Sequence, residues 1–126
     1  MEELAVSVSV RRGPVPIKAR GGNLLVIGNP LQNPLAAEAQ DKGADLPGRW
    51  DGSGLRPCLR FGRARVWHPW SGMILVGRNP WSLEGRLILV AGLSPAGTQV
   101  ACRKLISLTV LDSYAVAPTV RLRRDL

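Results

Sequence analysis

The sequence predicts a small α/β domain with a mixed sheet, in which two central parallel strands lie between two flanking helices, and with one hairpin. Two apolar runs carry this prediction, Leu24 to Ile27 and Leu87 to Ala91, because neither alternates with polar residues and each is followed by a glycine. Strands covered on both faces of a parallel sheet have this pattern. Each run leads into residues that start helices, which gives a strand-to-helix unit twice. A chain of 126 residues suits one core, so we expect a single domain over 1–126.

Both ends of the chain predict strands. Leu4 to Val10 alternates apolar and polar residues, which is typical of a half-buried strand at a sheet edge, and 119–123 alternates in the same way. Between the first of these strands and the first apolar run, the prolines of 11–16 interrupt regular structure, because proline lacks an N–H donor and restricts its predecessor.

Both predicted helices begin with a capping residue followed by proline. Asn33 and Ser94 can accept from first-turn N–H groups, and proline suits the first helical position. We expect the first helix to stop near Gly43 and the second near Ile106. The apolar spacing of the second helix predicts one face toward the core, made of Thr98, Ala101, Cys102, Leu105 and Ile106.

The middle of the chain predicts a long loop and a hairpin. Segment 42–58 is rich in Gly, Asp, Pro and Arg without periodicity, which favours a long surface loop, and ordered loops of that length are often functional. Two strand-like runs follow, Arg63 to Trp67 and Met73 to Val76, with the turn residues 68–72 between them. We therefore expect these two runs to pair as a hairpin.

The charge is strongly positive. The chain has 17 Lys+Arg against 9 Asp+Glu, a formal net charge of +8, and arginine supplies 14 of the 17 cations. Arginine forms two-pronged contacts with phosphates and carboxylates, so this excess favours an anionic partner. The alternatives are ion-pair networks of a heat-adapted protein and simple codon bias.

No segment predicts a membrane partner or an export signal. No apolar run approaches the roughly 20 residues of a membrane-spanning helix. The first residues are acidic where a secretory signal would be basic. We therefore expect a protein of the host cytoplasm or of a virion.

Three stretches carry a resemblance to a known group of proteins: LVIGNPLQNPL (25–35), NPW (79–81), and LVAG (89–92) followed by Gly97, Thr98 and Ala101. Together they resemble a small α/β module of archaeal surface-layer proteins and related hyperthermophile orphan proteins of unknown function. The first glycine is often doubled in that module, whereas here Asn29 follows Gly28, and this chain is basic where surface-layer chains are acidic. The resemblance implies the α/β fold and a hyperthermophilic host or its virus, with no catalytic residues to carry over.

The turns after Gly28 and Gly92 form the first candidate site. Ligands of open α/β sheets bind at the carboxyl ends of strands, where helix N-termini offer free N–H groups, so Asn33, Ser94 and Gly97 would frame an anion or a nucleotide. Neither turn has the glycines and lysine of a phosphate-binding loop. The alternative is that both turns only start their helices.

The second candidate site is rich in arginine and tryptophan. Arginines with exposed aromatic rings suit phosphate contacts and base stacking, and alternation places Arg63, Arg65 and Trp67 on one face. The alternative is that the tryptophans cover the core and the arginines are only solvated, which we expect for Trp50 and Trp81. The predicted nucleic-acid-binding residues are Arg49, Arg56, Arg60, Arg63, Arg65, Trp67 and Trp70.

Catalytic and metal chemistry have little support. His68 is the only histidine, no spacing pairs it with Cys58, and two cysteines with one histidine do not make a metal site. A disulfide between Cys58 and Cys102 is left open, as is a homo-oligomer. We therefore expect no cofactor and a non-enzymatic binding or assembly module that contacts nucleic acid or another polyanion. The alternatives are a nucleotide- or phosphate-binding protein and a structural component of a virion or surface layer.

Overall fold

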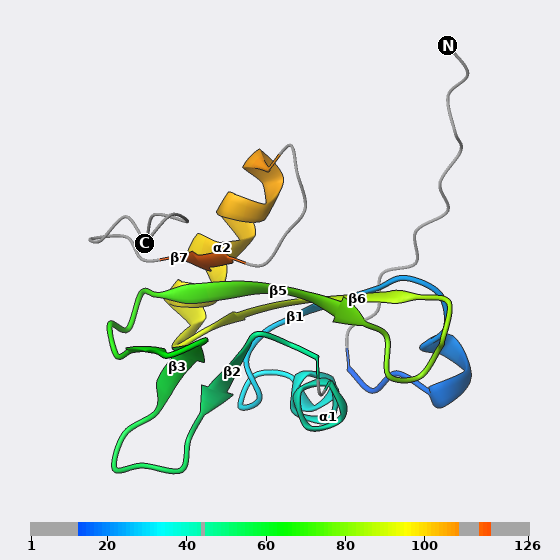
Figure 1. The fold of residues 1–126 in the computed structure, drawn as a ribbon, viewed down its shortest axis with the longest axis horizontal. Helices are drawn as coiled ribbons and strands as arrows, with labels where there is room; N and C mark the ends of the chain where they lie inside the picture. The colour runs from blue at the N-terminus through cyan, green and yellow to red at the C-terminus, as the bar shows by residue number, and fades with distance from the viewer. Residues whose placement is uncertain (1–12, 44, 109–113, 117–126) are drawn as a thin grey trace.

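A computed structural model describes residues 13–43, 45–108 and 114–116 of the chain. Two helices and two sheets make up this part of the molecule (Figure 1). The elements in chain order are the short 3-10 helix η1 (Ile17–Ala19), β1 (Leu24–Ile27), α1 (Pro34–Lys42), β2 (Gly48–Asp51), β3 (Cys58–Phe61), β4 (Ala64–Val66), β5 (Gly72–Arg78), β6 (Arg86–Gly92), α2 (Pro95–Ser107) and β7 (Tyr114–Val116).

The larger sheet separates the two helices. Its strand order is β1-β6-β5-β7, and α1 and α2 lie on opposite faces (Figure 1). Successive residues of a strand point to opposite faces, so β6 contributes to both cores. Leu87 and Leu89 join the core cluster that contains α1, whereas Val90 packs with Ala101 of α2. The α/β fold with a mixed sheet and two flanking helices is therefore confirmed.

The predicted parallel pair is present. Leu24 to Ile27 of β1 align in parallel with Leu87 to Val90 of β6, and β6 lies between β1 and β5. β1 itself takes the outer position of the described sheet. Val26 of β1 is buried toward α1, but Leu25 and Ile27 on its other face are 50% and 47% exposed. The reason is that α2 packs on β5 and β6.

The predicted helix starts are confirmed. Asn33 Oδ1 accepts from Leu35 N at 3.0 Å, and Ser94 Oγ accepts from Gly97 N at 3.3 Å. The predicted core face of α2 is wrong at Ile106, which is 85% exposed, although Thr98 and Ala101 are buried and Cys102 and Leu105 are partly buried. Figure 1 shows the cause, because α2 inclines away from the sheet toward its C-terminal end.

The predicted hairpin between the runs 63–67 and 73–76 is wrong. β4 pairs with β3 and β5 pairs with β6, so the runs Arg63 to Trp67 and Met73 to Val76 belong to different sheets. A two-residue turn accounts for this pairing: Gly62 has a φ of +59°, and Phe61 lies opposite Ala64. Glycine at the first central position is typical of tight hairpin turns.

Two further expectations concern segments near the ends and the middle of the chain. Within 42–58, predicted to be a long surface loop, the structure places β2, which is antiparallel to β3. The strands predicted at 4–10 and 119–123 lie outside the described residues. Among the helices of the described part, none is long and apolar enough to cross a membrane.

Candidate nucleic-acid interface

Three of the predicted arginines form one row across the smaller sheet. Arg49 of β2 lies opposite Arg60 of β3, and Arg60 lies opposite Arg65 of β4. Directly opposed residues of antiparallel strands point to the same face, and all three side chains are exposed. We call Arg49, Arg60 and Arg65 the arginine row. The spacing of these residues in the sequence does not reveal the row, because it depends on the register of three strands.

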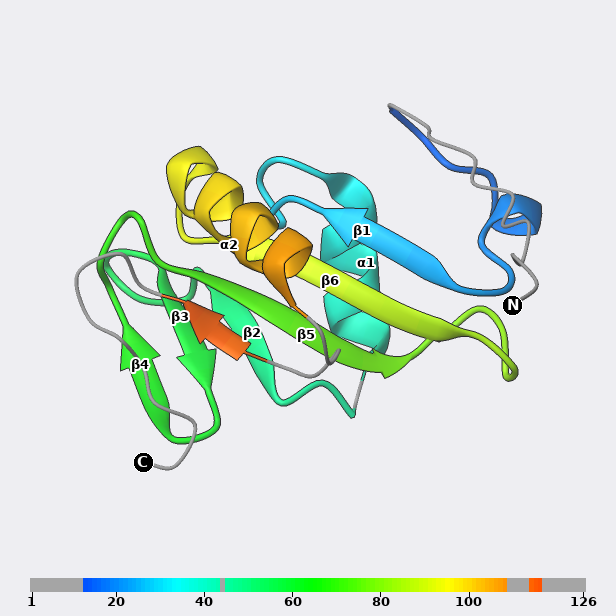
Figure 2. The ribbon, with the colours of Figure 1, turned by 90° about the horizontal axis from the view of Figure 1, so that it is seen from above.

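The other face of the same sheet packs onto the core. Trp50, Leu59 and Val66 are aligned across the three strands, and Leu59 is fully buried while the other two pack against the main cluster. The Gln40 side chain of α1 holds the outer edge of β2, since its Oε1 accepts from Trp50 N and its Nε2 donates to Trp50 O, both at 2.8 Å. The three strands that carry the arginine row are therefore held by the core behind them and by α1 at the edge of β2. Figure 2 shows β2, β3 and β4 side by side.

The positive charge of this face is only weakly neutralised. Within 48–67 there are five arginines and one carboxylate, Asp51. The Asp51 Oδ2 atom lies 3.6 Å from Arg60 Nη1, which makes an ion pair too long for a good hydrogen bond. Like charges directly opposite each other destabilise a sheet by up to about 1 kcal/mol per pair. The row therefore opposes stability, unlike the ion-pair network of the heat-adapted alternative.

A hollow of about 350 Å³ adjoins the arginine row. Its lining comes from the loop between β2 and β3, from Arg65 and Trp67, and from the buried Cys58. Arg65 therefore belongs to both the row and the hollow. The residues that line the hollow are Asp51, Ser53, Gly54, Leu55, Arg56, Cys58, Arg65 and Trp67.

Asp51 is held ionised at the side of this hollow. Its Oδ1 accepts from Ser53 Oγ at 2.6 Å and from Ser53 N at 3.0 Å. These hydrogen bonds, together with the positive charges of Arg60 and Arg49, lower the pKa of the Asp51 carboxyl below its ordinary value of 3.8. The ionised carboxylate only accepts hydrogen bonds, and Oδ1 already has two donors.

The remaining predicted contacts lie around this face. Arg63 occupies the exposed β3–β4 turn, and Arg56 lies in the loop beside the hollow. Trp67 is 44% exposed and lines the hollow, whereas Trp70, 56% exposed, does not line it. Trp70 belongs to a turn in which its backbone N–H donates to His68 Nδ1 at 3.1 Å. The structure thus gathers six of the seven predicted residues on the small sheet and its loops, with Trp70 beyond β4.

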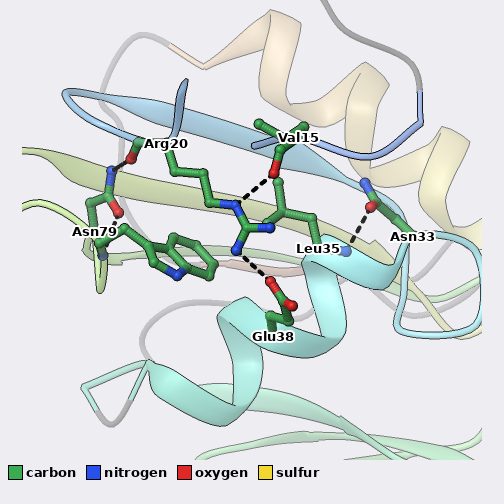
Figure 3. Close-up of polar contacts among 7 residues, drawn as sticks. Val15, Arg20, Asn33, Leu35, Glu38 and Asn79 are labelled. Carbon is green, nitrogen blue, oxygen red and sulfur yellow. Dashed lines mark hydrogen bonds and ion pairs between the residues drawn. The ribbon is translucent and has the colours of Figure 1, made fainter. Parts of the chain in front are cut away.

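Trp81 behaves as expected, and it has a partner that the sequence did not indicate. Trp81 packs against the core, and the Arg20 guanidinium lies 4.8 Å from its ring centroid. The same guanidinium donates to Val15 O at 2.9 Å and pairs with Glu38 of α1 (Figure 3). Arg20 is therefore a structural arginine. No sequence motif marks it, because its partners are far apart along the chain.

The polar groups of the turns after Gly28 and Gly92 form hydrogen bonds within and between the two turns. Asn29 Oδ1 accepts from the N–H groups of Leu31 and Gln32, and Asn29 Nδ2 donates to Gly92 O at 2.9 Å. Gln32 Oε1 accepts from Asn29 N and from Thr98 Oγ1, whose oxygen in turn accepts from Gly92 N. One network thus joins the predicted anion-binding loops.

The glycines at these turns serve backbone geometry and close packing. Gly28 has a φ of +121°, which favours glycine, and a methyl group on Gly97 would lie 2.1 Å from Ser71 O. Asn33 Oδ1 and Ser94 Oγ accept from the first-turn N–H groups of their own helices. These contacts favour turns that start helices, the alternative weighed for this site.

The nucleophiles and metal ligands stand apart from one another. Cys58 and Cys102 are both free thiols, on β3 and α2 respectively, and burial raises the pKa of the Cys102 thiol. The described ranges contain no group of three or more His, Cys, Asp or Glu side chains that could hold a metal ion. The arginine row and the hollow are therefore the best-supported candidate site.

Comparisons with known proteins add no assignment to this geometry. Protein-family models, curated proteins and solved structures were each compared with the chain, and none of them matches it.

Proposed function

We propose that this protein is a non-enzymatic binding module that engages nucleic acid through the outer face of the β2–β3–β4 sheet. The observation that carries the proposal is the register that sets Arg49, Arg60 and Arg65 directly opposite one another. Like charges in this arrangement repel each other in the free protein, and an anionic polymer laid across them removes the repulsion.

The dimensions of the row suit a phosphate backbone. Neighbouring strands lie about 4.8 Å apart, so the outer two arginines are about 10 Å apart at their Cα atoms. Arginine side chains of this length can contact successive phosphates, each through two parallel hydrogen bonds. Trp67 beside the row offers an aromatic face for an unpaired base.

The nucleotide- or phosphate-binding alternative has weaker support. It needs free N–H groups in the turns after Gly28 and Gly92, yet Leu31, Gln32 and Gly97 donate theirs to side chains of the same two turns. A phosphate there would have to displace these internal bonds. Among the residues that the structure describes, the carboxylate of Asp51 is the one competitor that pairs with the arginine row.

The test is the salt dependence of binding to short DNA oligonucleotides. Each neutralised phosphate releases counterions, so the logarithm of the binding constant falls with the logarithm of salt concentration, by about 0.7 per phosphate for single strands. The triple variant R49A/R60A/R65A should bind more weakly, and its slope should be shallower by about 2. Fluorescence anisotropy at several salt concentrations measures both quantities.

The matched control removes the same charge elsewhere. Lys18, Lys42 and Arg103 are exposed on η1, α1 and α2, where no strand register sets cations opposite one another, so K18A/K42A/R103A lowers the net charge by the same three units. This control should keep a slope close to that of the native protein. If the two triple variants have equal salt slopes, the loss of affinity reflects net charge and not the arginine row, which contradicts the proposal. If the native protein does not bind at low salt, the proposal is rejected.

A structural role in a surface layer or virion stays a prediction. The resemblance to an α/β module of archaeal surface-layer proteins, from which that role was inferred, also stays a prediction. Such a role predicts assembly of this chain with itself at low salt, without nucleic acid. Light scattering of the purified protein with and without added oligonucleotide distinguishes it from the binding module, because assembly would then be independent of the arginine row.

A further inference from the structure

We propose that the hollow beside the arginine row is a base-binding subsite for single-stranded nucleic acid and that it prefers bases carrying an exocyclic amino group. This inference rests on the proposed function, since the row would hold the backbone whose base enters the hollow. The preference is assigned to the ionised carboxylate of Asp51.

The lining of the hollow has the composition that an unstacked base requires. Trp67 presents a partly exposed indole ring, and Leu55 in the same lining is fully exposed. An aromatic ring and an aliphatic side chain can both contact a flat base, and stacking on an aromatic ring adds affinity to the phosphate contacts in single-strand binding. A volume of about 350 Å³ leaves room for one base.

The position of Arg65 connects the hollow to the row. Arg65 is the end of the row and also lines the hollow. A nucleotide whose phosphate contacts Arg65 can therefore turn its base toward Trp67, which directly follows β4 and lines the same hollow. Bases of a duplex are stacked inside the helix, so only a single strand can use both contacts.

The carboxylate makes the hollow selective for bases that offer a hydrogen-bond donor. Asp51 Oδ1 is occupied by Ser53, whereas Oδ2 lies 3.6 Å from the nearest arginine nitrogen, which leaves it able to accept another hydrogen bond. Cytosine presents its amino group as a donor, whereas thymine and uracil present a carbonyl oxygen at the same position. An ionised carboxylate attracts the first group and repels the second.

The first experiment compares oligo-dC with oligo-dU of equal length, which differ at this position and lack the thymine methyl group. Oligo-dC should bind the native protein about three- to tenfold more tightly, the contribution of one charge-assisted hydrogen bond in a partly open site. In Asp51→Asn the amide can still accept from Ser53 but also offers an N–H donor, so the preference should vanish or reverse.

The second experiment follows occupancy through Cys58, whose side chain is in the lining. In a Cys102→Ser background Cys58 is the single thiol of the chain. Saturating oligo-dC should slow its alkylation severalfold, and saturating duplex DNA should leave the rate unchanged, because its bases cannot enter. A Cys58→Ser variant reports Cys102 on α2, whose alkylation should not respond to either ligand.

The outcomes separate the two proposals. Salt-dependent binding through the row, with equal affinity for oligo-dC and oligo-dU or with Cys58 unprotected, overturns the base subsite and leaves the proposed function standing. A preference for oligo-dC that persists in Asp51→Asn overturns the role of the carboxylate. Failure of every oligonucleotide to bind rejects both.

Discussion

Arg60 has the least favourable surroundings of the arginine row, because both of its cross-strand neighbours are arginines. Its ion-pair partner, Asp51, also accepts two hydrogen bonds from Ser53. Arg49 and Arg65 each repel Arg60 at the distance of directly opposed strand residues. A sequence selected for stability alone would place β-branched residues at these positions. The row is therefore unfavourable for the free protein, as the proposed contact with an anion requires.

Replacing the end of the row should separate binding from stability. Arg65→Thr removes one repulsive pair and introduces a residue that favours strands, so the free energy of unfolding should stay equal or rise by up to about 1 kcal/mol. The same change should weaken oligonucleotide binding. Thermal unfolding and anisotropy of one preparation measure both effects. A loss of stability without a loss of affinity would support the heat-adapted alternative.

Asp51 should make the free energy of unfolding fall at acid pH. Its pKa is lowered in the folded state, so the ionised form stabilises the fold at neutral pH, and this contribution is lost as the pH falls below the ordinary value of 3.8 and through the lowered one. In Asp51→Asn this part of the acid dependence should be absent. Urea unfolding at a series of pH values between neutrality and acid compares the two proteins.

At the scale of elements, two buried asparagines join distant segments in the same way, through hydrogen bonds made by both ends of the side-chain amide. Asn29 and Asn79 each precede a proline, and each Oδ1 accepts from the N–H two residues later. Their Nδ2 groups reach across the fold, to Gly92 O from Asn29 and to Arg20 O and Gly22 O from Asn79. The first ties β1 to the end of β6, and the second ties the start of β1 to the end of β5 (Figure 3 shows the Asn79 contact).

Loss of either asparagine should destabilise the fold measurably. Asn29→Ala and Asn79→Ala each leave buried carbonyl and N–H groups without partners, so each should lower the free energy of unfolding by about 1–3 kcal/mol. Asn23, which is exposed and accepts from Arg86 N, provides the matched control. Asn23→Ala should cost about 0.5 kcal/mol or less. Equal losses at all three positions, measured by urea unfolding, would contradict the role of burial.

At the scale of the whole molecule, protection against hydrogen exchange should differ between the two sheets. β6 is paired on both sides and covered by both helices, whereas β4 is a short strand with one neighbour in the described sheet. Amides of β6 should therefore exchange slowest and those of β4 much faster. Bound oligonucleotide should slow exchange in β2, β3 and β4 while leaving β6 unchanged, which exchange followed by mass spectrometry can measure.

The features of this structure that depend on short stretches of sequence were predictable, namely the helix starts and the two apolar strands. The helix starts at Asn33 and Ser94 depend on neighbours within three residues, and the apolar runs of β1 and β6 depend on burial alone, so their patterns suffice. β2 was not predictable, because Trp50 is its one apolar residue and the strand depends on β3 and Gln40 for its partners.

The candidate site was predictable as a set of residues but not as an arrangement. The cluster of arginines and tryptophans indicated a surface for phosphates and bases, yet the row depends on two registers, that of β2 with β3 and that of β3 with β4, and the turn at Gly62 sets only the second. The hollow depends on how the β2–β3 loop folds back against Trp67. Both are tertiary features, and a single sequence without registers contains no direct signal for them.

The parallel pairing of β1 with β6 has a consequence for the order of folding. Asn29 and Gly92, which close one end of that pair, are 63 residues apart, so joining them requires the closure of a long loop. The β3–β4 and β5–β6 hairpins need only short turns and form faster. We therefore expect the β3–β4 part of the arginine row to acquire its register before β1 docks. A partly synthesised chain, or one in which β1 has transiently detached, would already present its cationic face.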